Sequence, residues 1–292
     1  MDRRAEILAG DRGVLAENGP MRMVIQAWCH GKPDHGMAMA AAEFAFICLG
    51  QVAKYRTRLI HRDPQPPCCL DERDAPVPFA MVQSVLAFDE PDLTPMAAVA
   101  GTMADAVADW LFQRGMTRVI VDNGGDIAIR LSGTETVRVG IRTDVKSPVI
   151  SHVMTLDARR SSWGVNTSGL GGRSLTRGIA SAVTVISETS SLADAAATAI
   201  ANACFSADEG IVQVPARLLD PGTDIPDIPV TVRVAELKPE TYVHALSAAL
   251  DRAEDYVDKQ LMGGALIATG GKEVWTRHFS EQVAALTMNA RS

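Results

Sequence analysis

One carboxylate and one hydroxyl in the second half of the chain have a spacing that suits a cation site. Asp194 and Thr198 stand four residues apart in the Ala-rich segment SSLADAAATAIANAC, residues 190–204, which predicts a helix. At this spacing both side chains lie on one helix face. Their hard oxygens suit Mg²⁺, which takes few protein ligands and leaves its other positions to water and phosphates. A solvated face or a local hydrogen bond also explains the pair, so both interpretations stay open.

Two glycines between an amide and a carboxylate follow an apolar, β-branched segment. The motif is Asn123-Gly124-Gly125-Asp126, and residues 117–122 before it predict a buried strand. Glycine tolerates positive φ and lets the backbone approach a ligand closely. A plain turn produces the same pattern, and the dinucleotide fingerprint G-x-G-x-x-G is absent. The motif therefore predicts either a tight turn or the floor of a ligand site.

A third stretch combines hydroxyls, glycines and a guanidinium. Its residues are Thr167, Ser168 and Gly169, followed by Gly171, Gly172 and Arg173 within the glycine-rich loop 169–178. Backbone N–H groups and a guanidinium can together hold a phosphate. A hairpin loop without a ligand accounts for the same composition.

Composition excludes several classes of protein. The 292 residues carry a net charge of -7, which argues against a nucleic-acid surface. Five cysteines show no metal-ligand spacing and six histidines are scattered, so neither a zinc site nor a disulfide framework is expected. The start of the chain has no apolar signal segment, and the apolar run 38–50 is interrupted by Glu43. We therefore expect a cytoplasmic protein without a membrane span or a nucleic-acid partner.

Predicted helices and strands position the three motifs. Thr94 and Pro95 open a helix that runs to about residue 114, where Gly115 ends it. After the first motif, segments 127–131 and 136–142 predict a hairpin, and 151–157, 161–167 and 181–187 predict further strands. The flanks predict strands at 21–28, 211–214, 230–234 and 265–269, helices at 37–55 (capped by Asp34), 79–88 and 240–260, and a proline-rich loop at 61–78.

This order of elements predicts an α+β fold: a mixed, largely antiparallel sheet covered by helices. No linker separates a second core, so residues 1–292 are expected to form a single domain, with the core motifs at 94–204.

The order of the motifs resembles that of the ApbE family, the FAD:protein FMN transferases. It is most similar to a shorter, soluble and poorly characterised branch, in which P-M-A-A-V-A-G precedes N-G-G-D as residues 95–101 precede 123–126 here. The resemblance implies that FAD lies across the sheet, that Mg²⁺ bridges its pyrophosphate, and that FMN passes to a Ser or Thr hydroxyl of an acceptor protein with release of AMP.

The resemblance also implies roles for individual residues. Asp194 and Thr198 match the family's metal ligands, and a backbone carbonyl near Val99 completes the protein ligands. Asp105 matches an Asp of the family's first helix, and residues 123–126 match its flavin-side loop. The resulting set of predicted cofactor-binding residues is Asp105, Asn123, Gly124, Gly125, Asp126, Thr167, Ser168, Gly169 and Arg173.

Two departures from the family leave the activity open. Ala100 stands where the family has a lysine, and residues 176–181 replace its H-I-I-D-P segment. Arg173 or Arg177 is a candidate for the missing cation.

Three functions remain: a Mg²⁺-dependent flavin enzyme that transfers FMN or hydrolyses FAD to FMN and AMP, a non-catalytic flavin- or nucleotide-binding protein, or an enzyme for another phosphorylated or acidic small molecule. The partners would be FAD or a related nucleotide and a flavin-acceptor protein. A homo-oligomer is left open.

Overall fold

One large antiparallel sheet forms the centre of the molecule. The computed structural model describes residues 3–10, 12–61, 70–172, 174–277 and 279. In this part of the chain ten strands form one sheet, in the order β1-β2-β3-β5-β6-β9-β10-β13-β14 with β4 paired to β3, and each of its strand pairs is antiparallel. Its strands are β1 (Arg4–Ile7), β2 (Val14–Asn18), β3 (Met21–Cys29), β4 (Lys32–Pro33), β5 (Arg118–Asp122), β6 (Asp126–Leu131), β9 (Ser162–Ser168), β10 (Ala182–Ser187), β13 (Gly264–Thr269) and β14 (Lys272–Trp275).

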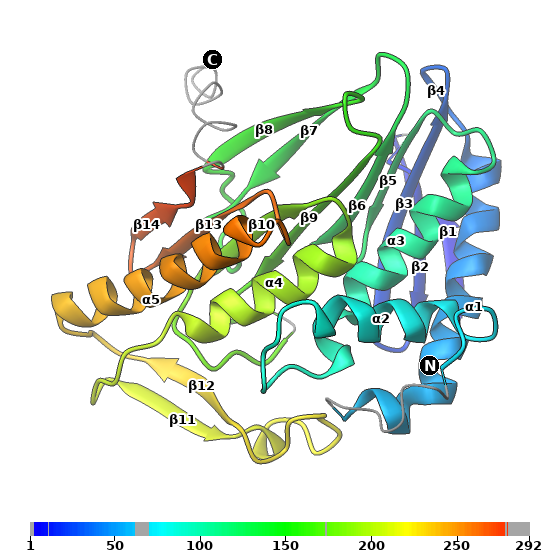
Figure 1. The fold of residues 1–292 in the computed structure, drawn as a ribbon. Helices are drawn as coiled ribbons and strands as arrows, with labels where there is room; N and C mark the ends of the chain where they lie inside the picture. Colours follow the sequence, from blue (N-terminus) through cyan, green and yellow to red (C-terminus); the bar gives the residue numbers. More distant parts are fainter. Residues whose placement is uncertain (1–2, 11, 62–69, 173, 278, 280–292) are drawn as a thin grey trace.

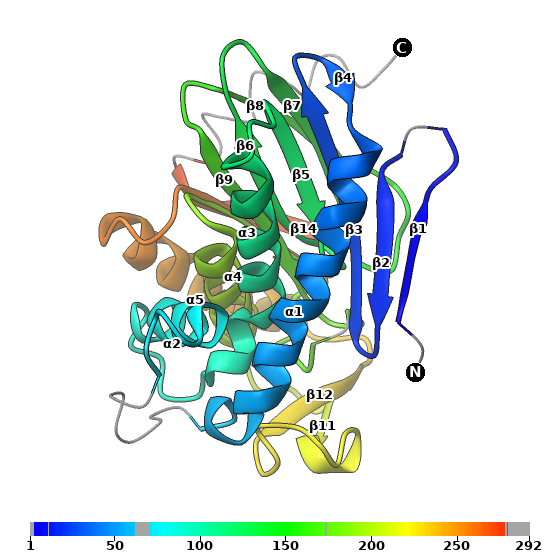
Figure 2. The ribbon, with the colours of Figure 1, turned by 90° about the vertical axis from the view of Figure 1, so that its right-hand side faces the viewer.

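Helices cover one face of this sheet. Figures 1 and 2 show α1, α3, α4 and α5 side by side across it, with α2 crossing near one end. The helices are α1 (His35–Leu59), α2 (Pro76–Leu86), α3 (Val99–Phe112), α4 (Ser190–Ala203) and α5 (Pro239–Asp258), with short 3₁₀ turns η2 (Pro95–Ala98) and η3 (Ala216–Leu218). The predicted α+β fold, a largely antiparallel sheet covered by helices, is confirmed.

A two-stranded layer packs on the opposite face. β7 (Thr136–Ile141) pairs with β8 (His152–Asp157), and an apolar cluster joins this layer to β6, β10 and β13. The predicted hairpin of 127–131 with 136–142 is wrong, because β6 pairs with β5 and β9 and has both edges occupied. Ile129 and Leu131 instead stack face to face with the buried side chains of β7. A second hairpin, β11 (Ile211–Pro215) with β12 (Pro229–Val234), lies apart from the main sheet (Figure 1).

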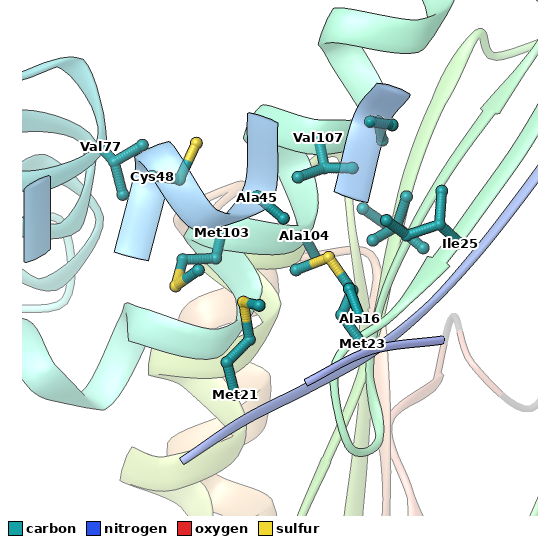
Figure 3. Packing of buried hydrophobic residues seen from close by; sticks show 14 of the residues in the cluster. Ala16, Met21, Met23, Ile25, Ala45, Cys48, Val77, Met103, Ala104 and Val107 are labelled. Atoms are coloured by element: carbon teal, nitrogen blue, oxygen red, sulfur yellow. The ribbon is translucent and has the colours of Figure 1, made fainter. Parts of the chain in front are cut away.

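Small and flexible apolar side chains fill the space between α1, α3 and the first strands. Figure 3 shows Met21 and Met23 of β3 beneath Ala45 of α1 and Met103 and Ala104 of α3. Alanine leaves little side chain between helix and sheet, and methionine adapts to the gaps that remain. The composition of these segments therefore permits the close helix packing that the site requires.

Helix α1 is longer than expected. Asp34 caps it as predicted, accepting a hydrogen bond of 2.9 Å from the N–H of Met37. By length and composition alone α1 could cross a membrane, which differs from the sequence expectation. In this structure eight of its residues are buried, and they pack against β2, β3 and the neighbouring helices.

The helix predicted for residues 94–114 is divided. Thr94 caps η2 by accepting a hydrogen bond of 3.2 Å from the N–H of Met96, and α3 begins after Ala98, whose φ of -119° departs from helical geometry. Gly115, with φ of +87°, follows the end of α3 as expected. The division opens a second helix N-terminus inside the molecule, and the candidate site is built there. Other differences from the sequence prediction are smaller. Helix α2 begins at Pro76 rather than at residue 79, and β1, β2 and β14 were not predicted. Residues 62–69 of the expected proline-rich loop lie outside the described residues.

Candidate functional site

Helices α3 and α4 each contribute a carboxylate that accepts hydrogen bonds from the first turn of the other helix. One oxygen of Asp194 in α4 accepts a hydrogen bond of 2.9 Å from the N–H of Gly101 in the first turn of α3. In return, Asp105 of α3 accepts hydrogen bonds from the N–H groups of Ser190 (3.0 Å) and Ser191 (2.7 Å) in the first turn of α4. The first N–H groups of a helix lack partners within it and carry a partial positive charge. The two acids therefore fix the helices relative to each other.

Gly101 allows this exchange. A Cβ atom at this position would overlap the carbonyl oxygen of Ser190 and lie 2.9 Å from the Cβ of Asp194. The first turns of α3 and α4 therefore come closer than any side chain at position 101 would permit. Close packing of α3 against α4 therefore explains why the 95–101 motif ends in glycine.

Asp105 is held by a buried arginine. Arg130 of β6 is 3% exposed, and its guanidinium lies 2.9 Å from Asp105 and 2.6 Å from Asp109. Burial raises the pKa of Asp105, and the positive charge of Arg130 opposes that rise. Because its oxygens already bind Arg130 and the first turn of α4, the described contacts give Asp105 a supporting role. Its cofactor-binding role stays a prediction.

The Asn-Gly-Gly-Asp motif forms a tight turn that also borders the site. It joins β5 to β6, with Gly124 and Gly125 at φ of +79° and +108°, and the N–H of Asn123 donates to the carbonyl of Asp126 at 3.0 Å. The side-chain amide of Asn123 donates to the carbonyl of Ala100 at 3.2 Å, which ties the turn to the start of α3. The motif therefore forms a tight turn and at the same time lies beside the start of α3, where the candidate site is.

Asn166 connects this turn to α4. It is fully buried in β9, opposite Asp126 in the sheet register. Its amide group donates to Asp126 at 3.0 Å, and its carbonyl oxygen accepts from the hydroxyl of Ser190 at 2.9 Å. We did not predict a role for Asn166. The available signal was an amide within the predicted strand 161–167, directly before Thr167.

The two carboxylates nearest the start of α3 repel each other. The pKa of Asp194 is raised well above its ordinary value, first by burial and then by the negative charge of Asp126, while N–H groups of Gly101 and Ala100 oppose the rise. A cation bound here would relieve both unfavourable effects.

The donor atoms around Asp194 fit such a cation. Thr198 lies one turn further along α4, partly buried, and its hydroxyl has no hydrogen-bond partner among the described residues. Val99 is the first residue of α3, two positions before Gly101. Within the described residues no three Asp, Glu, His or Cys side chains form a metal cluster. A metal held by the Asp194 carboxylate, the Thr198 hydroxyl and the Val99 carbonyl would draw on hard oxygens, which suit Mg²⁺. The metal assignment stays a prediction.

The predicted Thr-Ser-Gly segment reaches the same end of the sheet but divides between its faces. The N–H of Thr167 donates to the carbonyl of Gly125 at 3.3 Å, so the segment borders the turn. Strand alternation turns the Thr167 side chain away from α4, and its hydroxyl lies 2.9 Å from that of Thr184. Ser168 is buried, and Gly169 packs against the carbonyl of Ser181. Arg173 lies outside the described residues.

Arg177 is already engaged. Its guanidinium forms an ion pair with Asp92, and its N–H donates to the side-chain oxygen of Asn202 at 3.0 Å. Its carbonyl accepts hydrogen bonds from Gln213 and Thr231. The structure thus uses Arg177 to join neighbouring loops and strands.

A family model described as AbpE bacteria matches residues 5–275. Curated relatives include a UPF0280 protein of Methanocella arvoryzae, 36% identical over 162 residues, which are 53% of this chain and 65% of that protein. Another, from Methanosarcina barkeri, is 35% identical over 176 residues, 56% of this chain and 68% of that protein. The matched part of the chain thus spans just under two thirds of the first relative and slightly more of the second.

Two solved structures share the fold. The flavinyl transferase ApbE of Pseudomonas stutzeri, in its apo form, has a TM-score of 0.53 at 14% identity, with 97% of this chain and all of that chain covered. The flavin transferase ApbE of Vibrio cholerae has a TM-score of 0.51 at 12% identity, with the same coverage. At such identities the likeness concerns the fold.

Proposed function

The chain belongs to the family described as AbpE bacteria, and from this membership we propose that it is a flavin-transferase-like enzyme that acts on FAD with Mg²⁺. The observation that supports the proposal most is the arrangement around Asp194. A carboxylate with a raised pKa faces the first turn of α3, beside a second carboxylate and a hydroxyl that lacks a partner among the described residues.

In this proposal Asp194, Thr198 and the carbonyl of Val99 hold the metal. Bound Mg²⁺ supplies charge neutralisation for a pyrophosphate. The chain's own residues orient the site: Asp105 holds the first turn of α4, and Asn166 holds Asp126. The glycines of the turn leave room for close approach of a flat ligand.

The reaction is either transfer of FMN to a Ser or Thr hydroxyl of an acceptor protein, or hydrolysis of FAD to FMN and AMP. Both break the pyrophosphate bond, and both release AMP. The substitution of Ala100 for the family's lysine favours a second candidate, a flavin- or nucleotide-binding protein without catalysis. Another phosphorylated or acidic small molecule as the substrate is the third alternative.

Incubation of the purified protein with FAD and Mg²⁺, followed by quantification of AMP and FMN, tests the proposal. We expect AMP release that stops when EDTA is added. The same assay with an acceptor protein separates transfer from hydrolysis, because transfer leaves FMN covalently bound. Retention of unchanged FAD through dialysis supports the binding protein instead. Absence of both AMP release and FAD binding contradicts any function with this nucleotide.

A further inference from the structure

A nucleotide bound at this site would need positive charge near its phosphates, and most nearby cations are engaged elsewhere. Arg130 is buried between Asp105 and Asp109, and Arg177 pairs with Asp92. Arg22, near the start of β3, pairs with Glu17 at 2.9 Å. Arg173 of the glycine-rich loop lies outside the described residues, so among the residues that the structure describes a cation that is free for a ligand must come from another segment.

The connection between β7 and β8 brings such a cation to the glycine-rich loop. The N–H of Lys146 donates to the Asp144 carboxylate at 2.8 Å, and the N–H of Val145 donates to the carbonyl of Ser181 at 3.2 Å. The same Ser181 carbonyl lies 2.7 Å from where a Cβ of Gly169 would be. The backbone on either side of the Lys146 side chain is thus anchored next to the predicted Thr-Ser-Gly segment.

The Lys146 side chain then crosses the glycine loop itself. Its Cε occupies the space that a Cβ of Gly171 would need, and its Nζ lies 3.1 Å from that position. Gly171 has a φ of +95°, so this position favours glycine for its backbone as well as for its neighbour. The ammonium group has no hydrogen-bond or ion-pair partner among the described residues.

We propose that Lys146 binds a phosphate group of the nucleotide over the loop 169–172 and supplies the positive charge that Ala100 does not. This proposal rests on the proposed function, because it takes a phosphorylated nucleotide as the ligand. An ammonium group binds phosphate as a point charge. Together with loop N–H groups it can form a phosphate site.

The test compares Lys146→Met with Lys146→Arg and with Lys272→Met by isothermal titration in Mg²⁺. Lys272 is also exposed and lies at the same end of the sheet, on edge strand β14, so its substitution removes the same charge. The ligands are FAD, inorganic pyrophosphate, and riboflavin, which has no phosphate. We expect Lys146→Met to weaken FAD and pyrophosphate binding about tenfold, the worth of one charge-assisted contact. Riboflavin binding should not change, and Lys146→Arg should retain most of the affinity.

The outcomes separate this proposal from the function on which it rests. Equal FAD affinity of wild type and Lys146→Met overturns the role of Lys146 and leaves the flavin function standing. If pyrophosphate binding depends on Lys146 but FAD does not bind, the phosphate-binding role of Lys146 is supported and the flavin function is contradicted. Equal weakening by Lys272→Met shows a general charge effect and overturns the specific contact. If the wild type binds none of the ligands, both proposals fall.

Discussion

The carboxylate of Asp194 accepts a hydrogen bond of 2.9 Å from the backbone N–H of Gly101, a residue 93 positions earlier in the chain. Asp105, one turn further along α3, returns the interaction to Ser190 and Ser191 of α4. The candidate site is thus part of the packing between two helices. Substitutions in this contact should affect stability and ligand binding together, in ways that the following predictions separate.

Gly101→Ala should lower the free energy of unfolding by about 1–3 kcal/mol, because the added methyl group has no space and the helices must move apart. Gly50→Ala is the matched control. Gly50 lies in α1 with open space where the methyl group would be added, so alanine should stabilise the helix by about 0.5–1 kcal/mol. Urea denaturation measures both. Equal effects of the two substitutions would contradict the close contact at Gly101.

Asp105→Asn should destabilise the protein by about 3–5 kcal/mol, because it leaves the buried Arg130 without its buried charge partner. Asp109→Asn removes the other partner of Arg130. The side chain of Asp109 is 49% exposed, so this substitution should lower the free energy of unfolding by about 1 kcal/mol or less after solvent screening. Chemical denaturation of the two variants gives the comparison. A larger loss of stability from Asp109→Asn than from Asp105→Asn would contradict the assignment of Asp105 as the main charge partner of Arg130.

Asp194→Asn should stabilise the metal-free protein at neutral pH. The folded state raises the pKa of this carboxyl, so between its unfolded and folded pKa values the folded state binds more protons than the unfolded state. Stability then falls as pH rises through that window. Asparagine keeps an oxygen for the N–H of Gly101 and removes the charge.

Thermal unfolding from pH 4 upward, in EDTA, tests this dependence. Above the folded pKa the variant should be more stable than the wild type, by about 1.4 kcal/mol for each pH unit that separates the unfolded pKa from the folded pKa. Near pH 4 the two proteins should be similar. A wild type that gains stability relative to Asp194→Asn as pH rises would contradict the raised pKa of this carboxyl.

Thr198→Val should abolish the thermal stabilisation by Mg²⁺ while leaving the metal-free melting temperature nearly unchanged, because the hydroxyl has no partner among the described residues. Thr198→Ser keeps the oxygen and should restore the response. At a hundredfold excess of Mg²⁺ over Kd, binding to the wild type should add about 2.7 kcal/mol. If Thr198→Val responds to Mg²⁺ as the wild type does, this hydroxyl is not a ligand.

Local signals in the sequence were sufficient for much of the scaffold. Asp34 caps α1 and Thr94 caps the 3₁₀ turn η2, each at the predicted position, and the Asn-Gly-Gly-Asp motif forms a tight turn, one of the two interpretations that the sequence left open. Asp194 and Thr198 lie one turn apart on α4. Each of these features depends on residues within a few positions of each other, where side-chain type and backbone preference act directly.

Features that depend on distant pairing could not be predicted in the same way. The hairpin expected between 127–131 and 136–142 failed because the edges of β6 belong to β5 and β9. An apolar strand does not encode whether its neighbour pairs along its edge or stacks on its face.

The sequence by itself determined the α+β class, the motifs and the helix that carries Asp194. Only the tertiary structure decided that α3 begins after Ala98, that Arg130 supports Asp105, and that Asn166 joins Asp126 to α4. It also placed Lys146 over Gly171. The physical reason is that buried charges and amides need partners, and those partners come from strands and loops far away in the chain.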